Sequence, residues 1–290
     1  MTDTPRDQIQ SDIQRQSESI TDDTGRNLVV LFEERGLNLA AGYECHLRQI
    51  YQLALSSDIL PYRYFRNQQV LTTIDQLKLC QSCIAVAGAG GLGGYVADIL
   101  ARLGIGALIL IDPDIFTESN LNRQRFAVKE TLYMPKVNAA SQLIASINPA
   151  VEIFGHREKL SPENGAELLE GAAAAVDALD NIPDRLVLQA VCEKAGIPMV
   201  HGAIAGFEGQ VFTVMPGSSG LKNLYEDGQT AAPAPESVLG VPAITPMMIG
   251  GLQVMEVIKI LLNRGKPFAD TMVYVDLETA HLEKFRFGQQ

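Results

Sequence analysis

The sequence predicts an α/β protein with a mostly parallel sheet and helices on both faces, continued by antiparallel strands and preceded by a small N-terminal helical appendage. Two observations lead to this prediction. Short β-rich runs alternate with stretches of helical periodicity between residues 83 and 203. The first run, CIAVAG at 83–88, leads directly into the glycine-rich segment GAGGLGG at 88–94. A strand, a glycine loop and a helix in this order are typical of a Rossmann-like sheet.

The chain before the sheet divides into two segments. Residues 1–26 are polar and lack apolar periodicity, which predicts a disordered tail. Residues 27–60 place apolar side chains such as Leu47 and Ile50 at helical spacing, which predicts the helical appendage. We expect the main domain to occupy residues 61–290, where strand-like and helix-like segments alternate.

Within the main domain, the expected elements follow one another at the spacing of βαβ units. A first helix is expected at about 73–80. The strands of the parallel sheet are expected at 83–88, 107–112, 151–156, 174–179 and 198–203. Helical stretches lie between these strands at 92–103, 135–146, 162–170 and 183–195. Further strands are expected at 209–216 and 271–287, with a helix at 246–262 between them.

Composition narrows the class of protein. The 290 residues are 47% hydrophobic and 20% charged, which suffices for a sizeable core. The formal charge of -11 argues against a nucleic-acid surface. We find no signal peptide and no apolar run near the roughly 20 residues of a membrane helix, and we expect a cytoplasmic protein. The four cysteines do not resemble a disulfide framework: Cys45, Cys80, Cys83 and Cys192.

The glycine-rich segment predicts a nucleotide site. Gly88, Gly90 and Gly93 form G-x-G-x-x-G between a strand and a helix, so that backbone amides at the start of the helix can approach a phosphate. Asp112 ends the second strand, where a carboxylate can bind ribose hydroxyls. The alternative is a tight turn that only packs the helix on the sheet.

The residues after Asp112 favour a triphosphate over a nicotinamide. Arg123, Arg125 and Lys136 supply cations where a dehydrogenase would need a nicotinamide pocket. Arginine binds phosphate oxygens bidentately and lysine acts as a point charge, and together they stabilise charge that moves onto a leaving pyrophosphate. Each cation taken alone could equally be a solvated surface charge.

From Arg63 onward the sequence resembles the ThiF/MoeB/HesA family of adenylyltransferases, which are bacterial relatives of the ubiquitin-activating enzymes. The order and spacing of seven stretches make this resemblance specific. They read RYFRNQ, GAGGLGG, IDPDIFTESNLNRQ, MPKVNAA, INPAVEI, DALDN and HGAIAGFEGQV.

The resemblance implies roles for single residues. It implies an ATP site lined by Gly88, Gly90, Gly91 and Gly93, with Asp112 on the ribose and with phosphate contacts from Asn120, Arg123, Gln124 and Lys136. It also implies that Asp180 holds Mg²⁺ near the α-phosphate, although the residues alone suggest a helix N-cap at this position. In homodimers of the family, the arginine that corresponds to Arg66 reaches the ATP site of the other subunit.

The function implied by the resemblance is MgATP-dependent adenylation of a C-terminal glycine carboxylate, with release of pyrophosphate. The substrate would be a small ubiquitin-fold sulfur carrier protein, ThiS-like or MoaD-like, in thiamine or molybdopterin sulfur transfer. Two alternatives remain open: adenylation of another acyl group or of a tRNA base, and a scaffold that binds ATP without catalysis. A dehydrogenase is disfavoured by the Asn-Arg-Gln segment at 122–124.

The sequence departs from many family members in its cysteines. The regions that hold two C-x-x-C pairs in those relatives contain no cysteine, so no zinc is expected. Cys80 and Cys83 are interpreted as structural thiols and Cys192 as a buried small hydrophobe, which predicts adenylation without an enzyme-bound thioester. The segment GQTAAPAPESVLG at 228–240 is interpreted as a mobile loop over a bound peptide tail, or else as a linker.

Overall fold

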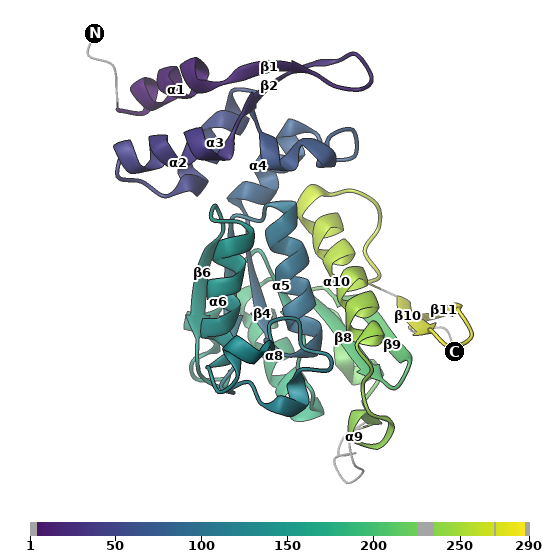
Figure 1. Cartoon of the computed structure of the whole chain (residues 1–290). Coiled ribbons are helices and arrows are strands. Elements are labelled where there is room, and N and C mark those ends of the chain that lie inside the picture. The colour runs from purple at the N-terminus through teal and green to yellow at the C-terminus, as the bar shows by residue number, and fades with distance from the viewer. Residues whose placement is uncertain (1–4, 226–234, 270, 288–290) are drawn as a thin grey trace.

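The computed structural model describes residues 5–225, 235–269 and 271–287. Its centre is an eight-stranded sheet with the order β11-β10-β9-β8-β7-β4-β5-β6 (Figure 1). Five neighbouring strands are parallel, as the sequence predicts. They are β4 (Cys83–Ala87), β5 (Ala107–Ile111), β6 (Glu152–His156), β7 (Ala174–Asp177) and β8 (Met199–Ala205).

The sheet continues with three antiparallel strands, which confirms the second part of the predicted fold. They are β9 (Glu208–Val214), β10 (Thr271–Asp276) and β11 (His281–Arg286). The segment 271–287 therefore forms a hairpin. Its turn is closed by Asp276, whose carboxylate accepts the backbone N–H of Glu278 over 2.9 Å.

Both faces of the sheet are covered by helices (Figure 1). One face packs on α5 (Gly91–Leu103), α6 (Lys136–Ile147) and α10 (Ile244–Leu262). The other packs on α7 (Gly165–Leu168) and α8 (Ile182–Ala195). Strand β4 contributes Ile84 and Val86 to the first core and Ala85 and Ala87 to the second. Because both faces are buried, the strand is a continuous apolar run rather than an alternating one.

Helix α10 corrects the expectation that no segment approaches the length and hydropathy of a membrane span. Within its 19 residues, a stretch of 18 has a mean hydropathy of 1.4, and half of that stretch is buried inside the protein. Buried residues such as Ile249, Val254 and Val257 belong to the core against the sheet. The helix is therefore apolar because it packs on the main core.

The order of the parallel strands creates a crevice. Strand β4 is the first strand of this sheet along the chain, and it pairs with β5 on one side and with β7 on the other. The connection after β4 leads to β5 on one side, whereas the connection after β7 leads to β8 on the other, so the two connections diverge from the carboxyl ends of these paired strands. In open α/β sheets, ligands bind at this position.

The N-terminal segment differs from the expected disordered tail. Residues Pro5–Gln16 form α1, and Glu18–Thr21 form β1, which pairs with the next strand. Ile13 of α1 is fully buried. The prediction was wrong because Ile9, Ile13 and Ile20 are too few to stand out as a periodic pattern in a polar segment, yet they pack on the following segment.

The appendage after residue 27 is only partly helical. Its helices are α2 (Glu33–Gly42) and α3 (Leu47–Ser56), as the spacing predicts. Residues Asn27–Leu31 instead form β2, which pairs with β1 and with the short β3 (Leu60–Pro61). In NLVVL, the β-branched valines favour a strand. The spacing of Leu28 and Leu31 is compatible with a helix but does not exclude a strand.

Candidate active site

A cavity of about 750 Å³ opens at the crevice between the carboxyl ends of β4 and β7. Eight of the eleven residues expected in the site line it: Gly88, Gly90, Gly91, Asp112, Arg123, Gln124, Lys136 and Asp180. They come from the three connections that follow β4, β5 and β7, which the parallel sheet brings to one edge. Gly93, Asn120 and Arg66 are not among the lining residues.

The glycine loop wraps tightly around the start of α5. Gly88 has φ +96, and a Cβ at this position would lie 2.5 Å from the carbonyl oxygen of Ala178. A Cβ on Gly93 would lie 1.7 Å from the carbonyl oxygen of Gly88. Gly93 therefore allows the helix to approach the loop, whereas Gly90, the N-cap residue of α5, lines the cavity. The exposed amides at this helix start suit an anion.

Asp112 and Lys136 form a linked pair on the cavity wall. The Asp112 carboxylate accepts the backbone N–H groups of Ala89 over 2.8 Å and Asp114 over 2.9 Å. Its oxygens retain lone pairs for ribose hydroxyls. The Lys136 ammonium lies 2.8 Å from the carboxylate of Asp114 and 3.6 Å from that of Asp112. Two carboxylates therefore hold this cation at the wall.

Arg123 follows the 3-10 helix η2 (Glu118–Asn120) and is fixed by its own loop. Its Nη1 donates to the carbonyl of Ser119 over 3.0 Å and to Oδ1 of Asn122 over 2.9 Å. Asn120 accepts the backbone N–H of Thr117 over 2.9 Å, so it shapes the loop and does not line the cavity. The phosphate contact expected of Asn120 stays a prediction.

Gln124 supplies an acceptor that lacks a donor. The residue is buried, and its Oε1 has no hydrogen-bond partner among the residues that the structure describes. A Cβ added to Gly90 would lie 3.5 Å from Nε2 of Gln124, so the amide packs against the glycine loop. A buried polar atom without a partner is costly, which favours a ligand that donates here.

Asp180 lies in the turn after β7, and its carboxylate is available to the cavity. The N-cap of α8 is not Asp180 but Asn181, whose side chain accepts the backbone N–H of Asp184 over 2.9 Å. The described residues hold no group of three or more His, Cys, Asp or Glu arranged for a metal. A magnesium ion on Asp180 would therefore complete its shell with phosphate and water oxygens, as this ion commonly does.

Arg66 lies far from this wall in sequence and in the fold. It belongs to the 3-10 helix η1 (Tyr62–Asn67), and 85% of its side chain is exposed. Its Nη1 is 3.7 Å from the carboxylate of Asp23, which is 91% exposed. Tyr64 of the same helix is buried and accepts a hydrogen bond from Nδ2 of Asn148 over 2.9 Å. The helix is anchored, and the arginine projects into solvent.

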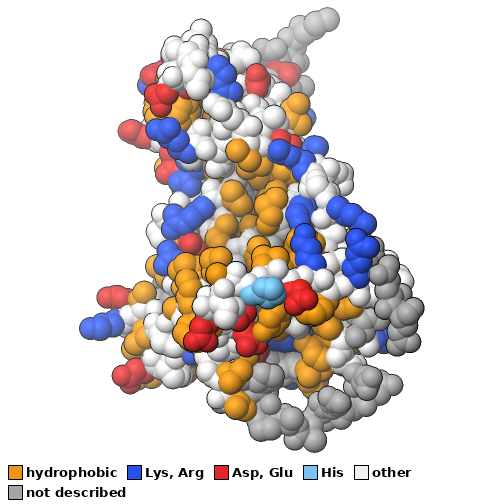
Figure 2. All heavy atoms as spheres, turned by 90° about the vertical axis from the view of Figure 1, so that its right-hand side faces the viewer, with side chains coloured by type: hydrophobic (Ala, Val, Ile, Leu, Met, Phe, Trp, Pro, Cys, Tyr) orange, Lys and Arg blue, Asp and Glu red, His pale blue; other side chains and the backbone are white. Residues whose placement is uncertain are grey.

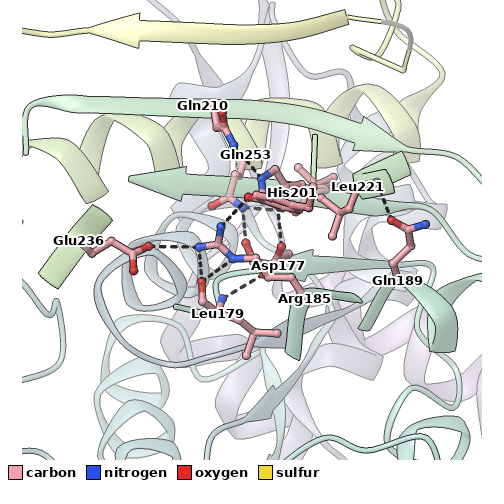
Figure 3. A network of polar contacts seen from close by, with 11 residues as sticks. Asp177, Leu179, Arg185, Gln189, His201, Gln210, Leu221, Glu236 and Gln253 are labelled. Carbon is pink, nitrogen blue, oxygen red and sulfur yellow. Dashed lines mark hydrogen bonds and ion pairs between the residues drawn. The ribbon is translucent and has the colours of Figure 1, made fainter. Parts of the chain in front are cut away.

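Sequence reasoning missed a polar network behind the cavity (Figure 3). Nδ1 of His201 lies 2.7 Å from the carboxylate of Asp177, and both side chains are fully buried. Burial lowers the pKa of His201, which favours a neutral ring at neutral pH. Arg185 and Glu236 form an ion pair at 3.2 Å beside them. No local sequence pattern links His201 to Asp177 or Arg185 to Glu236.

Sequence reasoning also missed an ion pair on the wall of the cavity. Lys159 and Asp184 line the cavity, and their charged groups are 2.9 Å apart. Lys159 follows β6, whereas Asp184 belongs to the first turn of α8. No sequence motif predicts a role for Lys159. It follows the strand segment VEIFGH at 151–156, at the edge of the sheet where ligands bind in this class of fold.

None of the four cysteines lines the cavity. Burial raises the pKa of the thiols of Cys80 and Cys192 to about 12, and that of Cys83 to about 11. These three thiols therefore stay protonated at neutral pH, which makes them weak nucleophiles and poor metal ligands. The expectation that Cys192 is a buried residue is confirmed.

Solved structures share this fold at low sequence identity. The Escherichia coli MccB structure with MccA-N7isoASN matches with a TM-score of 0.68 and 18% identity, over 79% of this chain and 72% of that one. The E. coli tRNA N6-threonylcarbamoyladenosine dehydratase matches with a TM-score of 0.59 and 22% identity, over 70% of this chain and 95% of that one. These matches confirm the α/β architecture.

Sequence relatives are more similar. The molybdopterin-synthase adenylyltransferase of Salmonella typhimurium is 34% identical over 242 residues, which are 81% of this chain and 95% of that protein. The sulfur carrier protein adenylyltransferase of Thermus thermophilus is 32% identical over 77% of this chain and 85% of that protein. An adenylyltransferase and sulfurtransferase of Zea mays is 34% identical over 79% of this chain, but the match covers only 48% of that longer protein. The sequence model of the ThiF family matches residues 64–290, and the chain therefore belongs to the ThiF family.

Proposed function

We propose that this protein is a MgATP-dependent adenylyltransferase that activates the C-terminal glycine carboxylate of a small ubiquitin-fold sulfur carrier. One observation supports the proposal above the others. The cavity at the strand-order reversal joins the amides of the glycine loop to the cations of Arg123 and Lys136, with the carboxylate of Asp180 on the facing turn. The relative of Thermus is named a sulfur carrier protein adenylyltransferase and that of Salmonella a molybdopterin-synthase adenylyltransferase, which supports this substrate class.

In the proposed reaction, one carboxylate oxygen of the substrate forms a bond to the α-phosphorus of ATP while the bond to the pyrophosphate oxygen breaks. No general base is needed, because a C-terminal carboxylate is already ionised at neutral pH. The protein aligns the two reactants and neutralises charge on the departing pyrophosphate. Arg123 and Lys136 are the cations placed for this role.

Magnesium would be held by Asp180, whose carboxylate lines the cavity and does not cap a helix. When bound, the ion supplies positive charge to the phosphate oxygens of ATP. The glycine loop and Gln124 would bind the nucleotide beside it, and Asp112 would accept hydrogen bonds from the ribose. The alternative of a scaffold without catalysis is disfavoured because the same cavity also holds the cations Arg123 and Lys136 beside Asp180, which ATP binding alone does not require.

We also propose a homodimer in which Arg66 of each subunit completes the phosphate site of the other. Arg66 is exposed and does not line the cavity of its own chain. The exposed side of α10 is apolar at Ile244, Met247, Met248 and Met255. The face of the molecule on the α10 side shows hydrophobic side chains gathered between Lys and Arg side chains (Figure 2). An apolar surface of this kind favours association.

The chemistry of the thiols supports a reaction without an enzyme-bound thioester and a fold without structural zinc. Burial raises the pKa of all four thiols, and none of them lines the cavity. All four cysteines are free, which favours a reducing, cytoplasmic environment.

Part of the segment 228–240, for which the sequence predicts a mobile loop, lies outside the described residues. The net charge of -11 argues against a nucleic-acid partner.

The proposal is tested by exchange of labelled pyrophosphate into ATP in the presence of a carrier protein that ends in Gly-Gly. Arg123→Ala should lower kcat/KM about 100-fold or more, because a cation that stabilises the leaving group is lost. Arg102→Ala is a matched control, since Arg102 pairs with Asp98 on α5 outside the cavity. A wild-type protein that binds ATP but shows no exchange with such carriers would contradict the proposed substrate.

A further inference from the structure

The roof of the cavity is a short segment held by three polar links. Helix α9 (Pro235–Leu239) begins it, and Glu236, Gly240 and Val241 line the cavity. The carboxylate of Glu236 pairs with Arg185 at 3.2 Å. The carbonyl of Gly240 accepts the N–H of Gly206 over 2.8 Å, and that of Val241 accepts Nδ2 of Asn122 over 3.3 Å. Among these links, only the one at Glu236 joins two charges.

Arg185 extends this link to the opposite wall. Its side chain is 5% exposed, and its Nε and Nη2 donate to the carbonyl of Leu179 over 3.1 and 2.7 Å. Its Nη1 donates to the hydroxyl of Tyr225 over 3.1 Å. The guanidinium therefore lies between the roof and the turn that immediately precedes Asp180 (Figure 3).

The same turn is fixed from its other side. The N–H of Leu179 donates to the carboxylate of Asp177 over 3.1 Å, and His201 holds that carboxylate at 2.7 Å. Both polar groups of the Leu179 backbone are thus bound by buried side chains. The carboxylate of Asp180, by contrast, contacts only Nδ2 of Asn181, at 3.2 Å, among the hydrogen bonds of the described residues. Its position depends on the turn rather than on contacts of its own.

We infer that Glu236 is a positioning residue: through Arg185 it couples the roof segment 236–241 to the Leu179–Asp180 turn, so that closure of the roof sets the position of Asp180. This inference rests on the proposed function, in which Asp180 holds the magnesium ion. Nη2 of Arg185 bonds both the carboxylate of Glu236 and the carbonyl of Leu179, so removal of that carboxylate releases the guanidinium from the roof and leaves Leu179 as the acceptor of this nitrogen. Disruption of the pair is therefore transmitted to the turn.

The test uses the full-length protein and the α,β-methylene analogue of ATP, whose binding is titrated against the Mg²⁺ concentration by calorimetry. Glu236→Ala should raise the Mg²⁺ concentration for half-maximal binding about tenfold, as is typical when a partner of a metal ligand is lost. Glu236→Gln, which keeps an oxygen acceptor for Arg185, should recover most of this effect. Hydrogen exchange should show faster exchange in Glu236→Ala at both 236–241 and 178–181.

The matched control is Glu193→Ala, because Glu193 accepts the backbone N–H of Gly217 over 2.9 Å outside the cavity. It should leave the Mg²⁺ dependence unchanged. Faster exchange of the roof alone, with an unchanged Mg²⁺ requirement, would overturn the coupling and leave Glu236 as an anchor of the roof. A wild-type protein that binds the analogue equally well without Mg²⁺ would overturn the proposed metal role of Asp180, and this inference with it.

Discussion

Lys136 shows how the site is prepared before a nucleotide arrives. Its side chain is 9% exposed, and its ammonium is held by the carboxylate of Asp114. Because Lys136 also lines the cavity, a phosphate bound there meets a cation that is already fixed in position, which limits the conformational entropy lost on binding. Lys136 could be predicted from the sequence, because its motif is local. Asp114 could not, since only the fold brings the end of β5 to the start of α6.

The reactivity of Cys192 tests our proposal that the reaction uses no catalytic thiol. Because burial raises the pKa of this thiol to about 12, we expect slow alkylation by iodoacetamide at pH 8 in the native protein and rapid alkylation in denaturant. Mass spectrometry of the modified peptides measures both rates. Cys192→Ser should retain carrier-dependent pyrophosphate exchange. Loss of exchange in a Cys192→Ser protein of unchanged thermal stability would require a catalytic thiol.

The buried His201 should make stability depend on pH. Burial lowers its folded pKa below the ordinary value of 6.5, so the unfolded chain binds a proton more readily in the interval just below 6.5. The stability that neutral His201 contributes is complete above pH 6.5 and is lost as the pH falls through that interval. In urea titrations, the wild type should therefore lose more unfolding free energy between pH 7 and pH 5 than His201→Asn.

A variant of an exposed histidine provides the comparison for this experiment. His281 lies on the edge strand β11 and is exposed. Its replacement by asparagine should leave the pH dependence close to that of the wild type. If the unfolding free energy of His201→Asn and of the wild type changed equally with pH, the protonation of His201 would be the same in the folded and the unfolded protein.

At the scale of elements, the sequence predicted the helices and strands that a local motif or a continuous apolar run identifies. The glycine loop and α5 follow from a motif, and β4 and β5 follow from apolar runs buried on both faces. Helix α1 and strand β2 were missed, because their stability comes from packing on α3 and on each other. Short elements with sparse apolar residues depend on tertiary contacts, and a sequence pattern does not show these contacts.

Ile13 tests whether the N-terminal segment is part of the fold. Its side chain is fully buried in the core of the appendage. Ile13→Ala should lower the unfolding free energy of that unit by about 2 to 5 kcal/mol, because it removes buried methyl groups and leaves a cavity. Ile74→Ala is the matched control, since Ile74 is 68% exposed, and it should change stability by less than about 0.5 kcal/mol. Equal stability of the two variants would indicate a disordered tail after all.

At the scale of the whole molecule, the parallel sheet gathers distant segments at one edge. The residues that bind ATP in our proposal could be predicted because each lies in a motif that follows a strand. Arg185 and Glu236 could not, because they are 51 positions apart and neither belongs to a pattern that suggests the other. The sequence therefore revealed the chemistry of the site better than the contacts that hold it in place.

The proposed dimer extends the site beyond one chain, and Arg66 carries that proposal. Its only ion pair among the described residues, with Asp23, joins two strongly exposed groups at 3.7 Å, and such a pair contributes little to stability. Arg66→Ala should therefore preserve folding and yet lower the exchange activity about 100-fold or more, as we expect for Arg123→Ala. In a two-fold dimer with shared sites, each subunit supplies one of the two arginines to a given site.

Mixing the two inactive variants distinguishes this arrangement from a monomeric site. After random exchange of subunits, half of the dimers are mixed, and each mixed dimer has one of its two sites built from an intact Arg123 and an intact Arg66. Activity should then return to about one quarter of the wild-type value. Each variant incubated alone under the same conditions should remain inactive, and size-exclusion chromatography should show dimers throughout. A monomer in solution, or a mixture that stays inactive after subunit exchange is demonstrated, would mean that Arg66 does not act on the partner subunit.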